Sequence, residues 1–125
     1  MRDREVVSLS LAIATAGLLA LFLAASIAQP KEVPLGELTG AQLGATVKVT
    51  GEIVKVKNHE AGHVFLRIRD STGEVAVPLF KNVAEEVDGS CLREGTHIEV
   101  IGRVKEYRGE LEVVPGKGDK VQCLM

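Results

Sequence analysis

The chain carries an unbroken run of uncharged residues close to its N-terminus, over residues 6–28. As a helix these 23 residues reach about 34 Å, whereas the hydrocarbon core of a bilayer is about 30 Å thick. The run therefore predicts a transmembrane helix at residues 6–28, behind a short flank at residues 1–5. Arg2 and Arg4 precede the run and Lys31 follows it, a bias that favours a cytoplasmic N-terminus and a domain outside the cytoplasm.

A cleaved signal peptide is the main alternative to a retained anchor. Ser26 and Ala28 are small residues at the −3 and −1 positions of a cut before Gln29. The apolar region of a signal peptide is usually about 7–15 residues long, which is shorter than this run. A retained signal anchor is therefore favoured over a cleaved signal, and both over a buried helix of a soluble fold. The first two alternatives place the chain after residue 30 outside the cytoplasm.

The remainder of the chain is long enough for one small domain. Residues 29–37, with Pro30 and Pro34, are predicted to be a linker, which leaves residues 38–125 as the domain. Without the four charged residues of the N-terminal flank, the chain has 13 basic and 15 acidic side chains and a net charge of −2. Domains that bind nucleic acid strongly usually carry a net basic surface, so the overall charge is not that of a strong nucleic-acid binder.

Apolar residues in the domain alternate at the two-residue period of β-strands. In the first strand Val47 and Val49 lie on one parity and Val54 and Val56 on the other, which predicts a bulge or bend near residues 51–53. Pro115-Gly116 interrupts the last strand, which residues 120–124 are able to resume. The alternation predicts five strands, a turn at residues 70–73 and a short helical or coil segment at residues 81–88, with the strands near residues 46–57, 63–69, 75–79, 97–106 and 110–114.

The strand order and the residues within it resemble a known family. A long bent strand, a hairpin, a connecting segment and a second hairpin follow the order of the five-stranded OB barrel. Over about residues 46–115 the chain resembles the OB-fold nucleic-acid-binding family that includes anticodon-binding domains. The implied fold class is all-β, a five-stranded OB-fold Greek-key barrel preceded by one N-terminal transmembrane helix. The resemblance rests on Val47-x-Val49-x-Gly51-Glu52-Ile53, Phe65-Leu66-x-Ile68-x-Asp70-x-Thr72-Gly73-x-Val75-x-Val77 and Gly95-x-x-Ile98-x-Val100-x-Gly102-x-Val104.

The resemblance also implies where a ligand would lie. In this family the ligand crosses the outer face of the second and third strands, between the loops that join strands one to two and four to five. Cationic side chains would follow the phosphates of a single strand, and an aromatic ring would stack on its bases. A solvated exterior or a protein-binding surface is the alternative, because the turn also sets Arg69 opposite Glu74 as an ordinary cross-strand pair. The matching residues are Phe65, Arg67 and Arg69, with Lys55 and Lys57 on the adjoining strand and Tyr107 and Arg108 at the rim.

Residues 59–63 spell His-Glu-Ala-Gly-His, the HExxH pattern of zinc proteases. That chemistry needs both histidines on one face of a helix. Here strand alternation comes before and after the pattern, and Gly62 opposes a helix, so residues 59–63 are predicted to be the loop of a hairpin. A solvated loop is favoured over adventitious or structural metal binding through His59 and His63, with or without His97. We expect no catalytic residue, no metal and no cofactor.

The two cysteines are expected to be neighbours. If Arg108-Gly109 is a two-residue hairpin turn, its register sets Cys123 opposite Glu94, three residues from Cys91. An outside location would allow a disulfide, which would close a loop of 33 residues. Two buried free thiols are the alternative.

Together these patterns predict a single-pass protein of the cell membrane, without enzymatic activity, whose OB-fold barrel lies outside the cytoplasm. The leading function, implied by the resemblance, is binding of nucleic acid, preferentially single-stranded, on the outer face of the second and third strands. The alternative is an extracytoplasmic adaptor that binds a protein or glycan partner of an envelope complex, an architecture that periplasmic OB-fold stress proteins share. The sequence leaves the true ligand, any sequence preference and the oligomeric state open.

Overall fold

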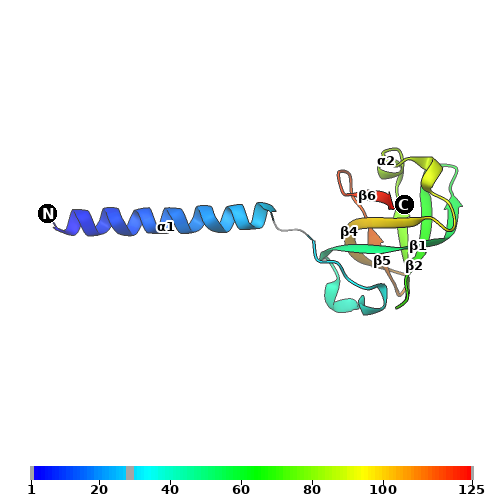
Figure 1. Cartoon of the computed structure of the whole chain (residues 1–125), viewed down its shortest axis with the longest axis horizontal. Helices are drawn as coiled ribbons and strands as arrows, with labels where there is room; N and C mark the ends of the chain where they lie inside the picture. The colour runs from blue at the N-terminus through cyan, green and yellow to red at the C-terminus, as the bar shows by residue number, and fades with distance from the viewer. Residues whose placement is uncertain (1, 28–29, 125) are drawn as a thin grey trace.

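The computed structural model describes residues 2–27 and 30–124, in which a closed β-barrel follows an N-terminal helix (Figure 1). Antiparallel pairs β1–β2, β2–β3, β4–β5 and β1–β4, with a parallel contact of β3 to β5, close the sheet on itself. The predicted OB-fold barrel is therefore confirmed, and all five predicted strands are present. The helix is α1 (Arg2–Ile27), and the strands are β1 (Thr46–Asn58), β2 (Val64–Arg69), β3 (Glu74–Leu79), β4 (His97–Tyr107) and β5 (Glu110–Val114).

Short elements join the strands. The helix α2 (Lys81–Ala84) and the 3-10 turn η3 (Gly89–Cys91) connect β3 to β4, in the region where a helical or coil segment was predicted. A sixth strand, β6 (Val121–Leu124), pairs with the first residues of β4, on the side of β4 that β5 occupies further along. The expectation that residues 120–124 resume the fifth strand is therefore confirmed.

The strand β1 bends at a β-bulge and so belongs to both halves of the barrel. Ile53 pairs with Ile68 and Lys55 pairs with Arg67, which leaves Val54 as an extra residue on β1. The first half of β1 pairs with β4, and the half after the bulge pairs with β2. The irregularity predicted near residues 51–53 thus lies at Val54.

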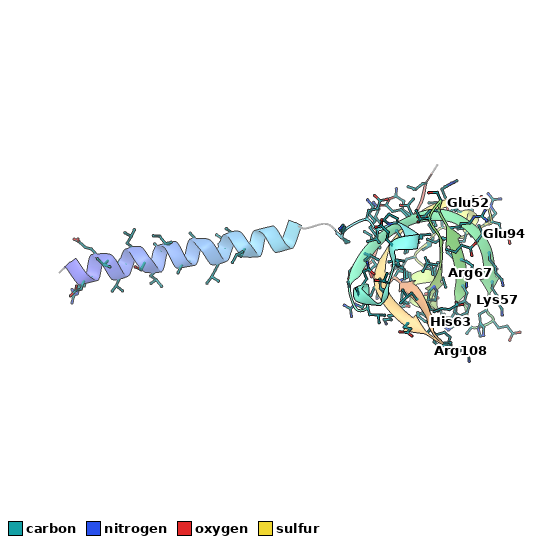
Figure 2. All side chains as sticks on the ribbon, turned by 90° about the horizontal axis from the view of Figure 1, so that it is seen from below. Glu52, Lys57, His63, Arg67, Glu94 and Arg108 are labelled. Carbon is teal, nitrogen blue, oxygen red and sulfur yellow. A yellow bond between two sulfur atoms is a disulfide. The ribbon has the colours of Figure 1, made fainter. Side chains whose placement is uncertain are left out.

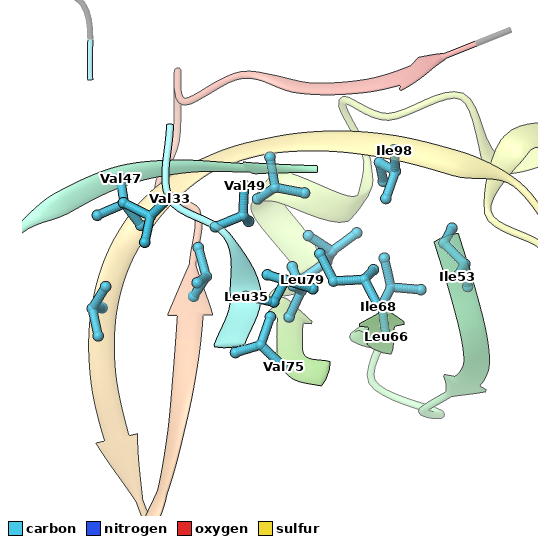
Figure 3. Close-up of a cluster of buried hydrophobic side chains, with 14 of the residues drawn as sticks. Val33, Leu35, Val47, Val49, Ile53, Leu66, Ile68, Val75, Leu79 and Ile98 are labelled. Atoms are coloured by element: carbon cyan, nitrogen blue, oxygen red, sulfur yellow. The ribbon is translucent and has the colours of Figure 1, made fainter. Parts of the chain in front are cut away.

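The barrel is filled by aliphatic side chains (Figure 3). Every strand from β1 to β5 contributes at least one of them, which is the outcome expected from the alternating pattern. No aromatic residue is among the buried core side chains of the described part of the chain. Side chains with no exposed surface include Val49, Ile53, Ile68, Val77, Leu79, Ile98, Val100, Val104 and Val113.

Residues 31–37, which we call the strap, pack on the barrel. The Val33 N–H donates to the Lys48 carbonyl at 3.0 Å, and the Lys48 N–H donates to the Lys31 carbonyl at 3.0 Å. Val33 and Leu35 are only 7% and 3% exposed, and Figure 3 shows both among the core side chains. The predicted linker at residues 29–37 is therefore corrected: the packed unit begins at Lys31, because the alternating Val33 and Leu35 add two core side chains.

Asp70 fastens the strap to the turn between β2 and β3. Its Oδ2 accepts a hydrogen bond from the Leu35 N–H at 2.9 Å, and its Oδ1 accepts from the Thr72 and Gly73 N–H groups at 2.7 and 3.0 Å. Burial raises the pKa of Asp70, but these hydrogen bonds and that of the Thr72 hydroxyl together hold the pKa below its usual value. Next to it, the Gly36 N–H donates to Thr72 Oγ1 at 2.8 Å.

Cys91 and Cys123 form a disulfide in the structure, with their Cα atoms 6.2 Å apart. The register that leads to this pairing differs from the expected one. The turn at Arg108-Gly109 has the predicted two-residue form, but Cys123 lies opposite Ile98 and not opposite Glu94. The loop that begins at Pro115 takes up the four positions of difference before β6 pairs with β4.

The described side chains of α1, at residues 3–21, are exposed. Within this helix residues 3–21 form a 19-residue stretch with a mean hydropathy of 1.6, long and apolar enough to cross a membrane. The predicted span at residues 6–28 has its last residue outside the described residues.

Candidate nucleic-acid interface

The predicted cationic residues share one outer face of β1 and β2. Leu66 and Ile68 are buried, so the alternating residues of β2 face outward. Lys57 is paired with Phe65, and Lys55 with Arg67, across the two strands. Figure 2 shows Lys57 and Arg67 on the same side of the barrel. We call this surface the β1–β2 face, and it consists of Lys55, Lys57, Phe65, Arg67 and Arg69.

Arg67 already has acidic partners on this face. Its guanidinium lies 3.4 Å from the Glu110 carboxylate and 3.8 Å from that of Glu74. Arg69 is opposite Glu74 in the strand register, as predicted, but the ion pair to Glu74 comes from Arg67 on the diagonal. Exposed pairs of this kind contribute about 0–1 kcal/mol, so a phosphate is able to compete for the guanidinium.

The outer surface changes sign toward β5. Glu74, Glu110 and Glu112 lie on that side, and Glu112 pairs with Ala76 of β3. Burial raises the pKa of Glu112, and the neighbouring Glu110 carboxylate raises it further. A hollow of about 300 Å³ between the strap and β5 is lined by Leu35, Arg67, Glu74 and Glu110 among others. A polyanion is therefore favoured over β1 and β2 and disfavoured over β5.

Tyr107 and Arg108 form the tip of the β4–β5 hairpin. Arg108 and Gly109 have φ angles of 51° and 80°, which is the geometry of a two-residue type I′ turn. The Arg108 Cζ atom lies 5.2 Å from the centroid of the Tyr107 ring, so that one face of the ring is covered by the guanidinium. Figure 2 shows Arg108 and His63 at the same end of the barrel, with Glu52 and Glu94 toward the other end.

Four aromatic rings gather where the β1–β2 loop meets the end of β3. The centroids of His63 and Phe80 are 5.6 Å apart, those of His59 and His63 5.8 Å, and those of His59 and Phe65 6.2 Å. We call His59, His63, Phe65 and Phe80 the ring cluster. Of this group, Phe65 was predicted to contact nucleic acid and His59 and His63 were considered as metal ligands, whereas no role was predicted for Phe80. The signal was the register of the two hairpins, which sets residue 59 opposite 63 and residue 63 opposite 80.

The HExxH residues form a hairpin loop, as predicted, and not a helix. The His59 N–H donates to the His63 carbonyl at 2.8 Å, and Gly62 has a φ of 92°. Both histidines use Nδ1 as an acceptor, His59 from the Ala61 N–H at 3.2 Å and His63 from the Lys81 N–H at 2.9 Å. Among the described residues no group of three or more His, Cys, Asp or Glu side chains is arranged to hold a metal ion.

Related sequences are found among DNA-processing enzymes. The exodeoxyribonuclease 7 large subunit of Chlorobaculum tepidum is 37% identical over 90 residues, which cover 67% of this chain and 21% of that protein. The corresponding subunit of Neisseria meningitidis serogroup C is 33% identical over 67 residues, which cover 52% of this chain and 15% of that protein. The chain thus spans about a fifth or less of the length of these curated relatives.

Solved structures share the barrel. An OB domain from Methanosarcina mazei superimposes with a TM-score of 0.64 at 18% identity, over 78% of this chain and 86% of that chain, and supports the fold. Asparaginyl-tRNA synthetase from Pyrococcus horikoshii matches with a TM-score of 0.60 at 28% identity, over 74% of this chain and 22% of that chain. The family described as OB-fold nucleic acid binding domain matches residues 47–119, which is more than half of the chain. The chain therefore belongs to the family of OB-fold nucleic acid binding domains.

Proposed function

We propose that this protein is a membrane-tethered binding module that holds single-stranded nucleic acid on the β1–β2 face. The observation that carries the proposal is the grouping of four cationic side chains around the exposed Phe65 on one face of an OB barrel. Lys55, Lys57 and Arg69 would follow the phosphates, and Arg67 would exchange a carboxylate partner for a phosphate. The Phe65 ring, 37% exposed, would stack on a base.

Fluorescence anisotropy with a labelled single-stranded oligonucleotide tests this proposal on the full chain in detergent micelles. We expect binding that weakens as salt rises, because each neutralised phosphate releases counterions. For single strands, the logarithm of the binding constant falls against the logarithm of the salt concentration with a slope of about −0.7 per neutralised phosphate. Changing Phe65→Ala together with Arg67→Ala should weaken binding at least about tenfold, since a stacking contact alone contributes about 1–3 kcal/mol.

The matched control changes one exposed apolar residue and one exposed cation away from the β1–β2 face. Leu43→Ala with Lys117→Ala removes the same kinds of group from the segment before β1 and from the β5–β6 loop. This double variant should bind as the unchanged protein does. Equal losses in both double variants, or no binding at low salt, would refute the β1–β2 face as the binding surface.

We infer that the chain binds without catalysing a reaction. In support, the relatives that are enzymes match this chain over only about 15–21% of their own length, and the HExxH residues lie in a hairpin loop. In the same assay, with Mg²⁺ added, the oligonucleotide should therefore keep its full length. Shortening of the oligonucleotide by the purified chain would overturn this inference.

We further propose that α1 anchors the barrel to the membrane, with the barrel outside the cytoplasm. The apolar length of α1 supports an anchor, and the arginines before it favour a cytoplasmic N-terminus. The disulfide between Cys91 and Cys123 supports an oxidising compartment for the barrel.

An extracytoplasmic adaptor for a protein partner is the second candidate. The acidic side chains beside the β1–β2 face favour it, because Glu74 and Glu110 already pair with Arg67 and leave a surface of mixed charge. Nucleic-acid sites usually carry a basic surface, whereas protein partners are able to complement charges of both signs. Absence of oligonucleotide binding at low salt would favour the adaptor.

A further inference from the structure

Three lysines form a row across the barrel near the start of β1, where the strap joins the barrel (Figure 1). The Lys48 N–H donates to the Lys31 carbonyl of the strap at 3.0 Å. On β4, Ile101 is paired with Lys48, and the Ile101 N–H donates to the Lys120 carbonyl at 2.8 Å. The strap, β1, β4 and the residue before β6 therefore lie side by side at this level of the barrel.

Further cations extend this row along β4 and into the β5–β6 loop. Val104 is buried, so Arg103 and Lys105 point outward from β4, and both are exposed. Together with Gly116 they line a hollow of about 250 Å³, and the exposed Lys117 follows Gly116 in the loop. We call this surface the β1–β4 face, and its cations are Lys31, Lys48, Arg103, Lys105, Lys117 and Lys120.

The β1–β4 face has more cations than its carboxylates neutralise. Glu99 is 8% exposed, and its carboxylate lies 2.7 Å from Lys48 Nζ and 3.7 Å from Lys120 Nζ, so one anion serves two ammonium groups. Within the described part of the chain no carboxylate is close enough to Arg103 or Lys105 to form an ion pair. The carboxylates that border the face are Glu32, Glu99, Glu112 and Asp119, fewer than its six cations.

The tether brings this face close to any membrane that α1 crosses. The uncharged run of the sequence ends at Ala28, three residues before Lys31, and three extended residues reach about 10 Å. If α1 spans a bilayer, Lys31 and the adjoining start of β1 are therefore held near its surface. This reach is comparable with the electrostatic screening length of about 8 Å at physiological ionic strength. Cations of the β1–β4 face would thus feel the charge of the lipid headgroups.

We propose that the β1–β4 face docks on anionic phospholipid headgroups of the bilayer that α1 enters. This inference rests on the proposed membrane anchor and is independent of the proposed nucleic-acid site. The β1–β2 face uses the half of β1 after the bulge, so docking leaves it free. Each cation held at an anionic bilayer surface strengthens binding about fivefold.

The tether favours headgroups over a soluble polyanion as the occupant of this face. Because α1 and the barrel belong to one chain, contact with the bilayer is an intramolecular step at a high effective concentration. A soluble polyanion would have to compete with headgroups that never leave the vicinity of Lys31. An anionic bilayer also presents many phosphates in one plane, which six separate cations are able to contact together.

Tryptophan fluorescence in lipid nanodiscs tests the docking on the full chain. The chain contains no tryptophan, so Thr46→Trp introduces a single indole, at an exposed residue that lines the hollow with Arg103 and Lys105. All discs contain phosphatidylcholine with a spin label on the headgroup, which quenches nearby indoles. We expect quenching at least about twofold stronger in discs that also contain phosphatidylglycerol than in discs of phosphatidylcholine alone.

A second indole controls for distance from the bilayer. Phe80→Trp lies at a residue 45% exposed, in the ring cluster beyond the far end of β1. Its quenching should be weak and equal in the two kinds of disc. Raising the salt concentration should lower the quenching of Thr46→Trp in phosphatidylglycerol discs to the level found with phosphatidylcholine alone.

Charge reversal identifies the docking residues. In the Thr46→Trp chain, Arg103→Glu with Lys105→Glu should abolish the difference between the two kinds of disc. Lys81→Glu with Arg93→Glu makes the same change of charge at two exposed residues between β3 and β4 and should preserve the difference. Loss of the difference in both double variants would refute the β1–β4 face, because net charge alone would then explain the effect.

The outcomes separate this inference from the proposals on which it builds. If the unchanged chain elutes apart from phosphatidylcholine discs on gel filtration, the anchor fails and the docking fails with it. If the chain stays with the discs and Thr46→Trp is quenched equally in both kinds, the docking is refuted while the anchor stands. If the reversal of Arg103 and Lys105 weakens oligonucleotide binding and leaves the quenching difference intact, the face binds nucleic acid and the docking is again refuted.

Discussion

Asp70 fixes the strap to the β2–β3 turn through a charged carboxylate. Hydrogen bonds from Leu35, Thr72 and Gly73 outweigh the effect of burial and lower the pKa of Asp70 in the folded chain. A lowered folded pKa means that the carboxylate stabilises the fold above its unfolded pKa of about 3.9. This stability is lost as the pH falls through the folded pKa.

We therefore expect Asp70→Asn to lower the free energy of unfolding by about 1–2 kcal/mol at pH 7. The difference from the unchanged protein should shrink as the pH falls below the unfolded pKa of about 3.9 and through the lowered pKa of the native carboxylate. Urea denaturation at pH 7 and at acid pH measures it. Ser71→Ala, in the same turn, is the control and should stay within about 0.5 kcal/mol at either pH. A difference for Asp70→Asn that is constant with pH would contradict the assigned role of the charge.

Some residue-scale features could be predicted from sequence and others could not. Gly51 was part of the family pattern, and the structure gives its reason: a Cβ there would lie 2.9 Å from the Arg69 carbonyl oxygen. The ion pair of Arg67 with Glu74 was not predicted, because strand register identifies the residue directly opposite while long side chains also reach diagonal neighbours.

At the scale of elements, the strap behaves as part of the barrel. Leu35 is 3% exposed and should contribute as much to stability as a leucine of the barrel core. Leu35→Ala should therefore lower the free energy of unfolding by about 2–5 kcal/mol. Leu43→Ala removes the same atoms from a residue that is 44% exposed and should cost less than about 0.5 kcal/mol. Urea denaturation of the two variants makes the comparison. Equal small effects would return residues 31–37 to a loose linker.

The strands were predictable because alternation over many residues is a strong signal. The strap was not predictable, since its apolar pattern covers only a few residues. Val33 and Leu35 are two apolar residues beside two prolines, a composition typical of a linker. The ring cluster was not predicted, for a different reason. His59, His63 and Phe80 are separated along the chain, and they meet once the registers of both hairpins are fixed. The predicted partner of Cys123 on β4 was also wrong, because the loop after β5 shifts the register by four positions. The composition of that loop does not reveal how far it shifts the register.

At the scale of the molecule, the packed strap leaves a short tether. Ile27 is the last residue of α1 and Lys31 is the first residue of the strap. Even a fully extended chain between them would reach no further than about 14 Å. If α1 spans the membrane, the barrel is held close to its surface. The strap pairs with β1 at Lys48, near the start of that strand, and the ring cluster begins beyond Asn58, at the other end of β1. The ring cluster therefore lies at the end of β1 that is remote from the strap.

The side of the membrane decides which ligands the barrel meets, and the cysteines report it. If the barrel lies outside the cytoplasm, the disulfide between Cys91 and Cys123 should persist in intact cells. A mass-tagged maleimide, applied after denaturation, should then label neither thiol without reductant and both after reduction. Cys123→Ser is the control, because it frees Cys91 and should give one label without reductant.

Protease added to the same cells should remove the barrel if it is outside. Two labels without reductant, together with a barrel protected from protease, would instead place it in the cytoplasm. That outcome would overturn the proposed topology. It would also strengthen the proposal that the barrel binds single-stranded nucleic acid, because this ligand is plentiful in the cytoplasm. A bonded and accessible barrel would mean that its nucleic acid has to come from outside the cell, and the adaptor would become the stronger candidate.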